Sequence, residues 1–504
     1  MTDSQETTII YNATLLLEDA YGEWEFQTGG IRIHQGKIVQ LGRGVELSGC
    51  GEVPEERTWD AKGAYLTPAF TNAHAHSYTG LLKRTVDRRT LDLYMLEVIA
   101  LGTDRSLDLI YDATLLHASE LISWGYARTV DHFSQRPFPT REGMEAAIQA
   151  YRDIGMKAVI APMFSDIPYL ETLPNQMQMS SVRATASARP ADEIRNYERL
   201  LRESSVRLQG SRDIQVALGV DGPQRCTKDT LAMTASLMRE LDIGWQTHLL
   251  ESHTQWSYGK ERDISLPTML DGYGLLGPKT SLVHAIWLAD EECERIARNG
   301  SHIVHCPTSN MHLGSGISPL QTYRRNGVQV FLGSDGDNCG TSSPYELMRT
   351  AARLSRLDGD NASDWWGAQD AYESQISVST LFPEVLGKGR LSVGEPADWI
   401  AYRPESFRVT TPEELFKELV YYETGRSVEA VMIDGNWKIK DGVPLRAWRN
   451  KLERAQKNMD VVLVESAEKL KQAGALFHIV QESAEASRGI VRENWVGNPR
   501  KIGL

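Results

Sequence analysis

The sequence contains two histidines two residues apart, His74 and His76, that could bind a metal ion. Neutral imidazoles are common ligands of Zn²⁺ and of other divalent transition metals. The pair follows the apolar run Tyr65–Phe70, which is typical of a buried β-strand. Because side chains two positions apart on a strand lie on the same face, both imidazoles point the same way if the strand continues that far. Taken alone, this pattern is more often two ordinary polar histidines than a metal site.

Three more chemically useful residues stand at the ends of β-rich runs. His248 and His284 each lie at the end of such a run, and Asp335 follows the run Val328–Gly333. A purely structural role as hydrogen-bonded strand ends does not explain why so many such residues share this position. The strands of a parallel barrel carry their active site at their C-terminal ends, so we expect all five side chains on one rim.

Eight short β-rich runs alternate with longer amphipathic stretches, which predicts parallel βαβ units. Clear helices are expected at Ser106–Trp124 and Arg141–Gly155, the second ending at its glycine. A doubly wound open sheet is the competing arrangement, but no GxGxxG turn follows the first run. The predicted fold class is therefore α/β, with a (β/α)8 TIM-like barrel. The eight runs are Tyr65–Phe70, Ala127–Phe133, Lys157–Met163, Ile214–Val220, Ile243–Leu249, Ser281–Ala285, His302–Cys306 and Val328–Gly333.

The two ends of the chain have a different texture from the barrel region. Residues 1–66 and 388–445 contain short strands with glycine-rich turns, and we expect them to combine into one small β-sandwich domain. Residues 67–387 form the predicted barrel, and residues 446–504 a helical C-terminal tail. The stretch Leu170–Asp192 is expected to be an insertion over the barrel mouth.

Composition excludes several classes of protein. The 504 residues are 41% hydrophobic and 24% charged, which is ordinary for a globular protein and not for a disordered or coiled-coil chain. The net charge of −13 argues against nucleic acid as a partner. No apolar run reaches the roughly 18–20 residues of a membrane helix, so no membrane association is expected. The start of the chain lacks a signal-peptide pattern, and the five cysteines form no CxxC pair, so a cytoplasmic location is predicted.

Several motifs together resemble the amidohydrolase superfamily, within the group of cytosine, guanine and S-adenosylhomocysteine deaminases and s-triazine hydrolases. The resemblance spans roughly residues 8–445. It is carried by the segment from Thr67 to His76, the His248-x-x-Glu251 pair, His284, Cys306-Pro307-Thr308-Ser309-Asn310, Leu332-Gly333-Ser334-Asp335-Gly336 and Gly394-Glu395-Pro396-Ala397-Asp398.

The resemblance implies a site for one divalent metal ion held by His74, His76, His248 and Asp335. Zn²⁺ is the expected ion, with Fe²⁺, Mn²⁺ and Co²⁺ as alternatives. Two-metal members of the superfamily usually place a bridging lysine at the end of the fourth strand. Here that strand ends at Asp221, and the nearest following lysine is Lys228. One ion is therefore expected.

Such an ion lowers the pKa of a bound water to about 7 and supplies hydroxide at neutral pH. Asp335 is expected to take the proton of this water, and His284 to hold the hydroxide or the developing oxyanion. Glu251 is expected to protonate a ring nitrogen of the substrate and then to help the amine leave. Asp221 and Gln224 are candidate substrate contacts. Asn310 is another, or it supports the metal ligands.

The expected reaction is deamination of an amino-substituted nitrogen heterocycle with release of ammonia. The same site could instead remove chloride or an alkylamine from a triazine, or cleave an amide, urea or carbamate C–N bond. These alternatives stay open, because loops such as Thr79–Tyr94 and Leu170–Asp192 would select the leaving group. A barrel that has lost its chemistry and serves only in binding is a further alternative. The expected partners are a small nitrogen-containing substrate and further copies of the chain in a homo-oligomer.

Overall fold

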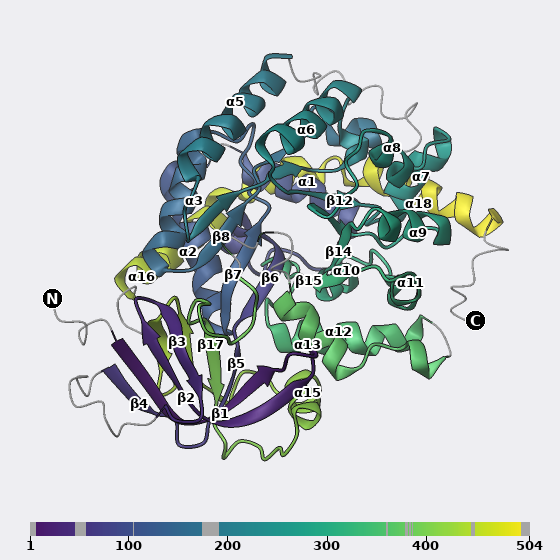
Figure 1. Cartoon of the computed structure of the whole chain (residues 1–504). Coiled ribbons are helices and arrows are strands. Elements are labelled where there is room, and N and C mark those ends of the chain that lie inside the picture. The colour runs from purple at the N-terminus through teal and green to yellow at the C-terminus, as the bar shows by residue number, and fades with distance from the viewer. Residues whose placement is uncertain are drawn as a thin grey trace.

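The computed structural model describes residues 7–45, 57–103, 105–173, 191–358, 361–377, 382, 385, 387–444 and 449–494. Figure 1 shows a β-sheet layer, built from both ends of the chain, beside a larger body of strands and helices. No helix among these residues is long and apolar enough to cross a membrane.

The sheet layer joins segments far apart in the sequence. Within the described residues it has nine strands: β1 (Thr7–Glu18), β2 (Trp24–His34), β3 (Lys37–Gly42), β4 (Thr58–Asp60), β5 (Tyr65–Pro68), β17 (Trp399–Tyr402), β18 (Val428–Ile433), β19 (Asn436–Lys440) and β20 (Val443–Pro444). The two ends meet where β5 pairs antiparallel with β17. The Ile38 amide in β3 also donates to the Glu395 carbonyl at 2.9 Å, so the sheet curls back on itself around its own apolar core. This is how the composite β-domain expected from the sequence is built.

The first strand of the barrel differs from the sequence prediction. The run Tyr65–Phe70 is not one barrel strand: β5 ends at Pro68 in the sheet layer, and the barrel begins with β6 (Phe70–His76). The backbone changes partners between them, because the Ala69 amide donates to the Asp398 carbonyl and the Phe70 amide to the Gly125 carbonyl, both at 3.2 Å. Both parts are apolar and buried, so the pattern does not mark this change. The domain boundary at residue 66 stays a prediction, although β5 extends two residues past it.

The barrel strands are all parallel and form a closed ring of eight in the described part of the chain. Three of the eight strands are each split into two segments, and β16 pairs with β6 to close the ring. The predicted barrel is therefore confirmed. In chain order its segments are β6, β7 (Tyr126–Asp131), β8 (Lys157–Ile160) with β9 (Met163–Phe164), β10 (Ile214–Val216) with β11 (Leu218–Val220), β12 (Trp245–Leu249), β13 (Thr280–His284), β14 (His302–His305), and β15 (Val330–Leu332) with β16 (Asp335–Gly336).

Helices surround this ring (Figure 1). The two helices singled out in the sequence are confirmed as α2 (Leu107–Ser123) and α3 (Arg141–Ile154), capped at their starts by Ser106 and Thr140. Gly155 ends α3 in the left-handed conformation, with φ of 70°. The other described α-helices between β6 and β17 are α1 (Leu91–Gly102), α5 (Ala191–Leu208), α6 (Lys228–Leu241), α7 (His253–Glu261), α8 (Leu266–Gly272), α9 (Asp290–Arg298), α10 (Pro307–His312), α11 (Leu320–Asn326), α12 (Pro344–Leu354) and α13 (Ala368–Ile376). One more helix, α15 (Pro412–Tyr421), lies between β17 and β18.

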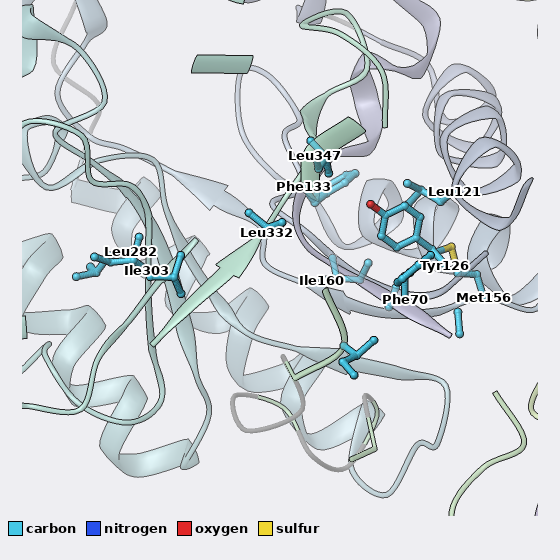
Figure 2. Packing of buried hydrophobic residues seen from close by; sticks show 14 of the residues in the cluster. Phe70, Leu121, Tyr126, Phe133, Met156, Ile160, Leu282, Ile303, Leu332 and Leu347 are labelled. Atoms are coloured by element: carbon cyan, nitrogen blue, oxygen red, sulfur yellow. The ribbon is translucent and has the colours of Figure 1, made fainter. Parts of the chain in front are cut away.

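Two apolar cores follow from the alternation of side chains along the strands. In β13, Leu282 belongs to the core between strands and helices, whereas Val283 belongs to the core inside the barrel. In β14, Ile303 and Val304 divide in the same way. Figure 2 shows part of the outer core, including Tyr126 from β7. Because both faces of each strand are packed, the strand ends are held firmly.

The C-terminal tail is helical, as predicted, with α16 (Arg449–Glu465), α17 (Ala467–Gly474) and α18 (Phe477–Asn494). In Figure 1 these yellow helices cross from α2 past α1 to α7, and each of these neighbours packs against the tail. Of the expected insertion over the barrel mouth, residues 174–190 lie outside the described part of the chain.

Candidate active site

The polar strand ends meet at one rim of the barrel. His76 Nε2 lies 3.2 Å from His248 Nε2 and 3.4 Å from an Asp335 carboxylate oxygen. The same oxygen is 3.6 Å from His74 Nε2. His284 Nε2 lies 3.9 Å from the other Asp335 oxygen and 3.5 Å from Glu251. The structure thus brings together residues separated by more than 250 positions in the sequence.

The orientation of three imidazoles is fixed through their Nδ1 atoms. His74 Nδ1 lies 2.6 Å from Gln246 Oε1, His76 Nδ1 2.8 Å from the His132 carbonyl, and His248 Nδ1 2.6 Å from the Asp221 carbonyl. A carbonyl oxygen only accepts hydrogen bonds, so each Nδ1 carries the proton and donates it. In the neutral imidazole, each Nε2 then presents a lone pair toward the rim.

These lone pairs and the Asp335 carboxylate form a donor set that suits a metal ion. Ligand atoms of His74, His76 and His248 lie within 4.8 Å of one another, as do those of His74, His284 and Asp335. His74 Nε2 is buried and has no hydrogen-bond partner among the residues that the structure describes. Since buried polar atoms are normally paired, a cation at this point satisfies an otherwise costly arrangement. The rim is a histidine-rich metal site.

The electrostatics of these groups follow from burial and from their neighbours. Burial, assisted by His74, lowers the pKa of His76 to about 3. Burial also acts to lower the pKa of His248, but the hydrogen bond and charge of Asp221 raise it to about 9. Burial opposes ionisation of Asp335, but His74 and the neighbouring imidazoles hold its pKa well below the usual range. An ionised carboxylate beside neutral imidazoles is the form in which these groups ligate a metal, so binding of an ion displaces the proton that His248 holds at neutral pH without it.

Asp335 and His284 are aimed by unusual backbone geometry. Their φ angles are +64° and +68°, in a left-handed region that is uncommon for residues other than glycine. Val283 points into the barrel, so simple alternation would turn the next residue, His284, outward. The left-handed turn instead brings it to the rim. Strain of this kind concentrates at functional sites.

Glu251 and His284 form a second pair beside the metal site. Burial, with a smaller contribution from the Asp335 charge, raises the pKa of Glu251 to about 8. Its Oε1 atom is buried, and no side chain or backbone group in the described part of the chain hydrogen-bonds to it. Burial also lowers the pKa of His284 to about 3. A carboxyl group that holds its proton near neutral pH, next to a neutral imidazole, is suited to proton transfer.

A cavity opens directly above these groups, between the barrel rim and α1. Glu251, His284 and Asp335 line it together with the predicted substrate contacts Asp221 and Gln224. The Asp221 carboxylate is paired with Arg225, which with His248 keeps its pKa low against the effect of burial. Apolar and aromatic side chains line much of the rest of the cavity, and the described ones include Leu91, Tyr94, Met95, Val98, Met163, Tyr169 and Leu313.

Asn310, the third predicted substrate contact, is placed differently. It is fully buried, and among the described residues that line the cavity it does not appear. Its Oδ1 accepts a hydrogen bond from His284 Nδ1 at 2.8 Å, and its Nδ2 faces His305 Nδ1 at 3.5 Å. This arrangement corresponds to the second role considered for it, support of the site's histidines.

Some supporting residues were not singled out in the sequence. Gln246 orients His74, and its Nε2 donates to the Ala73 carbonyl and to Ser281 Oγ, each at 3.0 Å. The sequence pattern could have identified Gln246, because it lies two residues before His248 on one strand and so shares its face. The His132 carbonyl that holds His76 gives no such signal, because any residue supplies a carbonyl.

Comparisons with known proteins agree with this geometry. The sequence matches the amidohydrolase family over residues 65–438, and the chain belongs to that family. It is 27% identical to an 8-oxoguanine deaminase of Pseudomonas aeruginosa over 434 residues, which covers 83% of this chain and 92% of the relative. It is 26% identical to a 5′-deoxyadenosine deaminase of Methanothermobacter thermautotrophicus over 388 residues, 76% and 84% of the two chains.

The fold also matches solved structures. An atrazine chlorohydrolase of Arthrobacter aurescens TC1 complexed with zinc superimposes with a TM-score of 0.75 at 19% identity, over 90% of this chain and 99% of that chain. The likeness supports the barrel with its sheet region and C-terminal helices. The protein is accordingly a metal-dependent, deaminase-like hydrolase of the amidohydrolase family that acts on C–N bonds.

Proposed function

We propose that this protein deaminates an amino-substituted nitrogen heterocycle, using water and releasing ammonia. The observation that carries the proposal is Glu251: a buried carboxyl group with a pKa of about 8 and a free Oε1 atom, lining the cavity 3.5 Å from His284. Ammonia is a poor leaving group unless it is protonated, so deamination needs such a proton donor.

The proposed ligands of one divalent ion are His74, His76, His248 and Asp335, and Zn²⁺ suits their nitrogen and oxygen atoms. When bound, the ion acts as a Lewis acid and lowers the pKa of a water molecule attached to it from about 15.7 to about 7. Against the effect of burial, Asp221 raises the pKa of His248 to about 9, and this greater basicity strengthens His248 as a ligand.

The remaining steps belong to side chains of this protein. Asp335 accepts a proton from the attacking water, since its low pKa keeps it ionised beforehand. His284 Nδ1 carries the ring proton and donates a hydrogen bond to Asn310 Oδ1. The lone pair on His284 Nε2 can therefore accept a hydrogen bond from the same water and hold it in place. Glu251 gives its proton to the ring nitrogen as water adds to the neighbouring carbon. The proton that Asp335 took from the water then passes to the amine, which leaves as ammonia, and the hydroxyl proton of the adduct returns to Glu251 as the oxo group forms. The product carries an oxo group in place of the amino group.

The substrate class is supported by the cavity and by the relatives. Aromatic and aliphatic side chains such as Tyr94, Met95 and Tyr169 suit the faces of a flat heterocycle, while Gln224 offers an amide to its edge. Gln224 Oε1 is buried and no described residue hydrogen-bonds to it, as expected for a group that pairs with a ligand. The two relatives compared above are named as deaminases of an oxopurine and of a deoxynucleoside.

The test is a mass-spectrometric screen of zinc-loaded enzyme with parallel detection of ammonia and chloride. The panel contains 8-oxoguanine, guanine, adenine, 5′-deoxyadenosine, cytosine, amino- and chloro-triazines, and simple ureas and carbamates. Ammonia with an amino-to-oxo product is the expected result. Chloride, an alkylamine or a cleaved acyl product without ammonia would assign the site to one of the other hydrolyses. No turnover of any compound with any of Zn²⁺, Fe²⁺, Mn²⁺ and Co²⁺ would favour a binding protein without chemistry.

A further inference from the structure

Helix α1 presents two apolar faces. Leu91, Tyr94, Met95 and Val98 recur at helical spacing and line the cavity. On another face, Leu93, Leu96 and Ala100, which do not line the cavity, belong to or pack against a second apolar cluster. A helix that is apolar on two sides needs a partner on each. The barrel mouth covers one side, and the C-terminal tail covers the other.

The tail meets the outer face of α1 through α17 and α18. Ala473 and Val480 are buried in the cluster with Leu96, and Phe477 packs against it. Leu470 of α17 reaches the neighbouring cluster that contains Tyr94 and Val98 of the cavity wall. The tail therefore packs directly behind residues that face the cavity.

Polar contacts fix the ends of α1 on both sides. Lys469 Nζ donates to the Thr103 carbonyl at the C-terminal end of α1, at 3.0 Å. The Arg89 guanidinium, just before α1, lies 5.0 Å from the centre of the Phe477 ring. On the barrel side, Asp92 accepts from Tyr169 and from Thr254 of α7, each at 2.9 Å.

The tail is anchored away from the mouth as well. In α16, Arg454 and Asn458 each contact the buried carboxylate of Asp112 in α2 at 2.6 Å. Lys451 pairs with Asp153 of α3 at 2.6 Å. At its other end α18 packs against α7, which follows Glu251. The tail thus spans from the outer barrel helices α2 and α3 to α1 and α7, which each contribute residues to the cavity lining; Figure 1 shows its path as the yellow ribbon.

We infer that α17 and α18 are positioning elements of the substrate pocket: they hold α1, the helix that forms the apolar cavity wall, and thereby determine how tightly substrate binds. None of their described residues lines the cavity or lies among the proposed metal ligands. The effect on substrate binding rests on the proposed function, whereas the placement of α1 by the tail is independent of it. Loosening the tail should weaken binding of substrate and leave metal binding and the chemical step largely intact.

The test compares two variants of the full-length, zinc-loaded protein. Val480→Asp places a carboxylate in the fully buried contact with α1, whereas Gln481→Asp places the same group on the adjacent exposed position. For Val480→Asp we expect amide hydrogen exchange in 91–102 to accelerate at least ~10-fold, and KM to rise by a similar factor, about 1.4 kcal/mol. The kcat value and the one equivalent of zinc should be retained. Gln481→Asp should match the wild type in all four.

Two smaller substitutions keep the inference testable if Val480→Asp does not fold. Val480→Ala removes methyl groups from the contact, so the hydrogen exchange of α1 and the KM should both rise, but less than in Val480→Asp. Val480→Ile keeps an apolar side chain in the contact and should show wild-type values of both. Unchanged exchange of α1 and unchanged KM in Val480→Asp or Val480→Ala would overturn the inference. So would a loss of kcat and zinc with KM unaltered. Absence of ammonia release by the wild type would refute the proposed function alone, because α1 exchange is measured without substrate.

Discussion

Replacing Gln246 by leucine tests the claim that the orientation of His74 creates the metal site. Gln246 is fully buried and makes three hydrogen bonds: His74 Nδ1 at 2.6 Å, the Ala73 carbonyl at 3.0 Å and Ser281 Oγ at 3.0 Å. Its amide cannot be turned around, because the Ala73 carbonyl requires a donor and thus directs the amide oxygen to His74. Leucine has a similar volume and none of these polar atoms.

The size of the effect follows from what the substitution leaves unpaired. The His74 N–H and the Ala73 carbonyl lose their partner, and a buried unpaired group costs about 1–3 kcal/mol. We therefore expect the free energy of unfolding of the metal-free protein to fall by about 2–6 kcal/mol. Zinc affinity should fall about 10- to 100-fold, because His74 is no longer held with its lone pair toward the rim.

The assay is a competitive titration with a zinc chelator, monitored in parallel with circular dichroism to confirm the fold. Ser281→Ala is the matched control, since it removes one contact of Gln246 and none of the metal-site histidines. Its zinc affinity should stay within about threefold of the wild type, a change below 1 kcal/mol. A folded Gln246→Leu protein that binds zinc as tightly as the wild type would refute the reasoning about His74.

The remaining predictions concern the ligands, the proton donor and the junction between the two layers. His248→Ala should purify without stoichiometric metal, as measured by plasma mass spectrometry. Glu251→Gln should keep its metal and lose at least ~100-fold in kcat, because it lacks the proton donor. A fully active Glu251→Gln enzyme would contradict the proton-transfer role. Asp398 is buried against Lys157 and Arg128, each with a contact at 2.8–3.0 Å, so Asp398→Asn should lower the free energy of unfolding by about 3–5 kcal/mol in urea denaturation. Burial opposes ionisation of Asp398, but the two cations lower its pKa from 3.8 to about 2. Its stabilising contribution is therefore fully present above pH 3.8 and is lost as the pH falls through about 2; an equal acid dependence in the wild type and Asp398→Asn would contradict this.

The barrel and the residues at its rim could be predicted because each depends on a local pattern. His248 and His284 directly end apolar runs, and the rule that a barrel gathers its strand ends then places them together. The capping residues Ser106 and Thr140 likewise mark their helices without reference to the rest of the chain.

Other features depend on partners that no local pattern encodes. The change of sheet between β5 and β6 is set by whether a backbone amide meets Asp398 or Gly125, and both parts of the run are equally apolar. The role of Asn310 depends on the approach of His284, 26 residues away in sequence. The apolar faces of α1 predict burial on both sides, but only the folded chain shows that the tail supplies one of the covers.

The central claim is that one metal ion, held at the barrel rim, drives release of ammonia from a heterocycle. The most direct measurement is a titration of metal-free enzyme with Zn²⁺ while the rate of ammonia release is followed with the best substrate of the panel. We expect activity to rise linearly and to stop rising at one equivalent of zinc per chain, and we expect no such rise in Asp335→Ala. Full activity without metal, or a break at two equivalents, would contradict the claim.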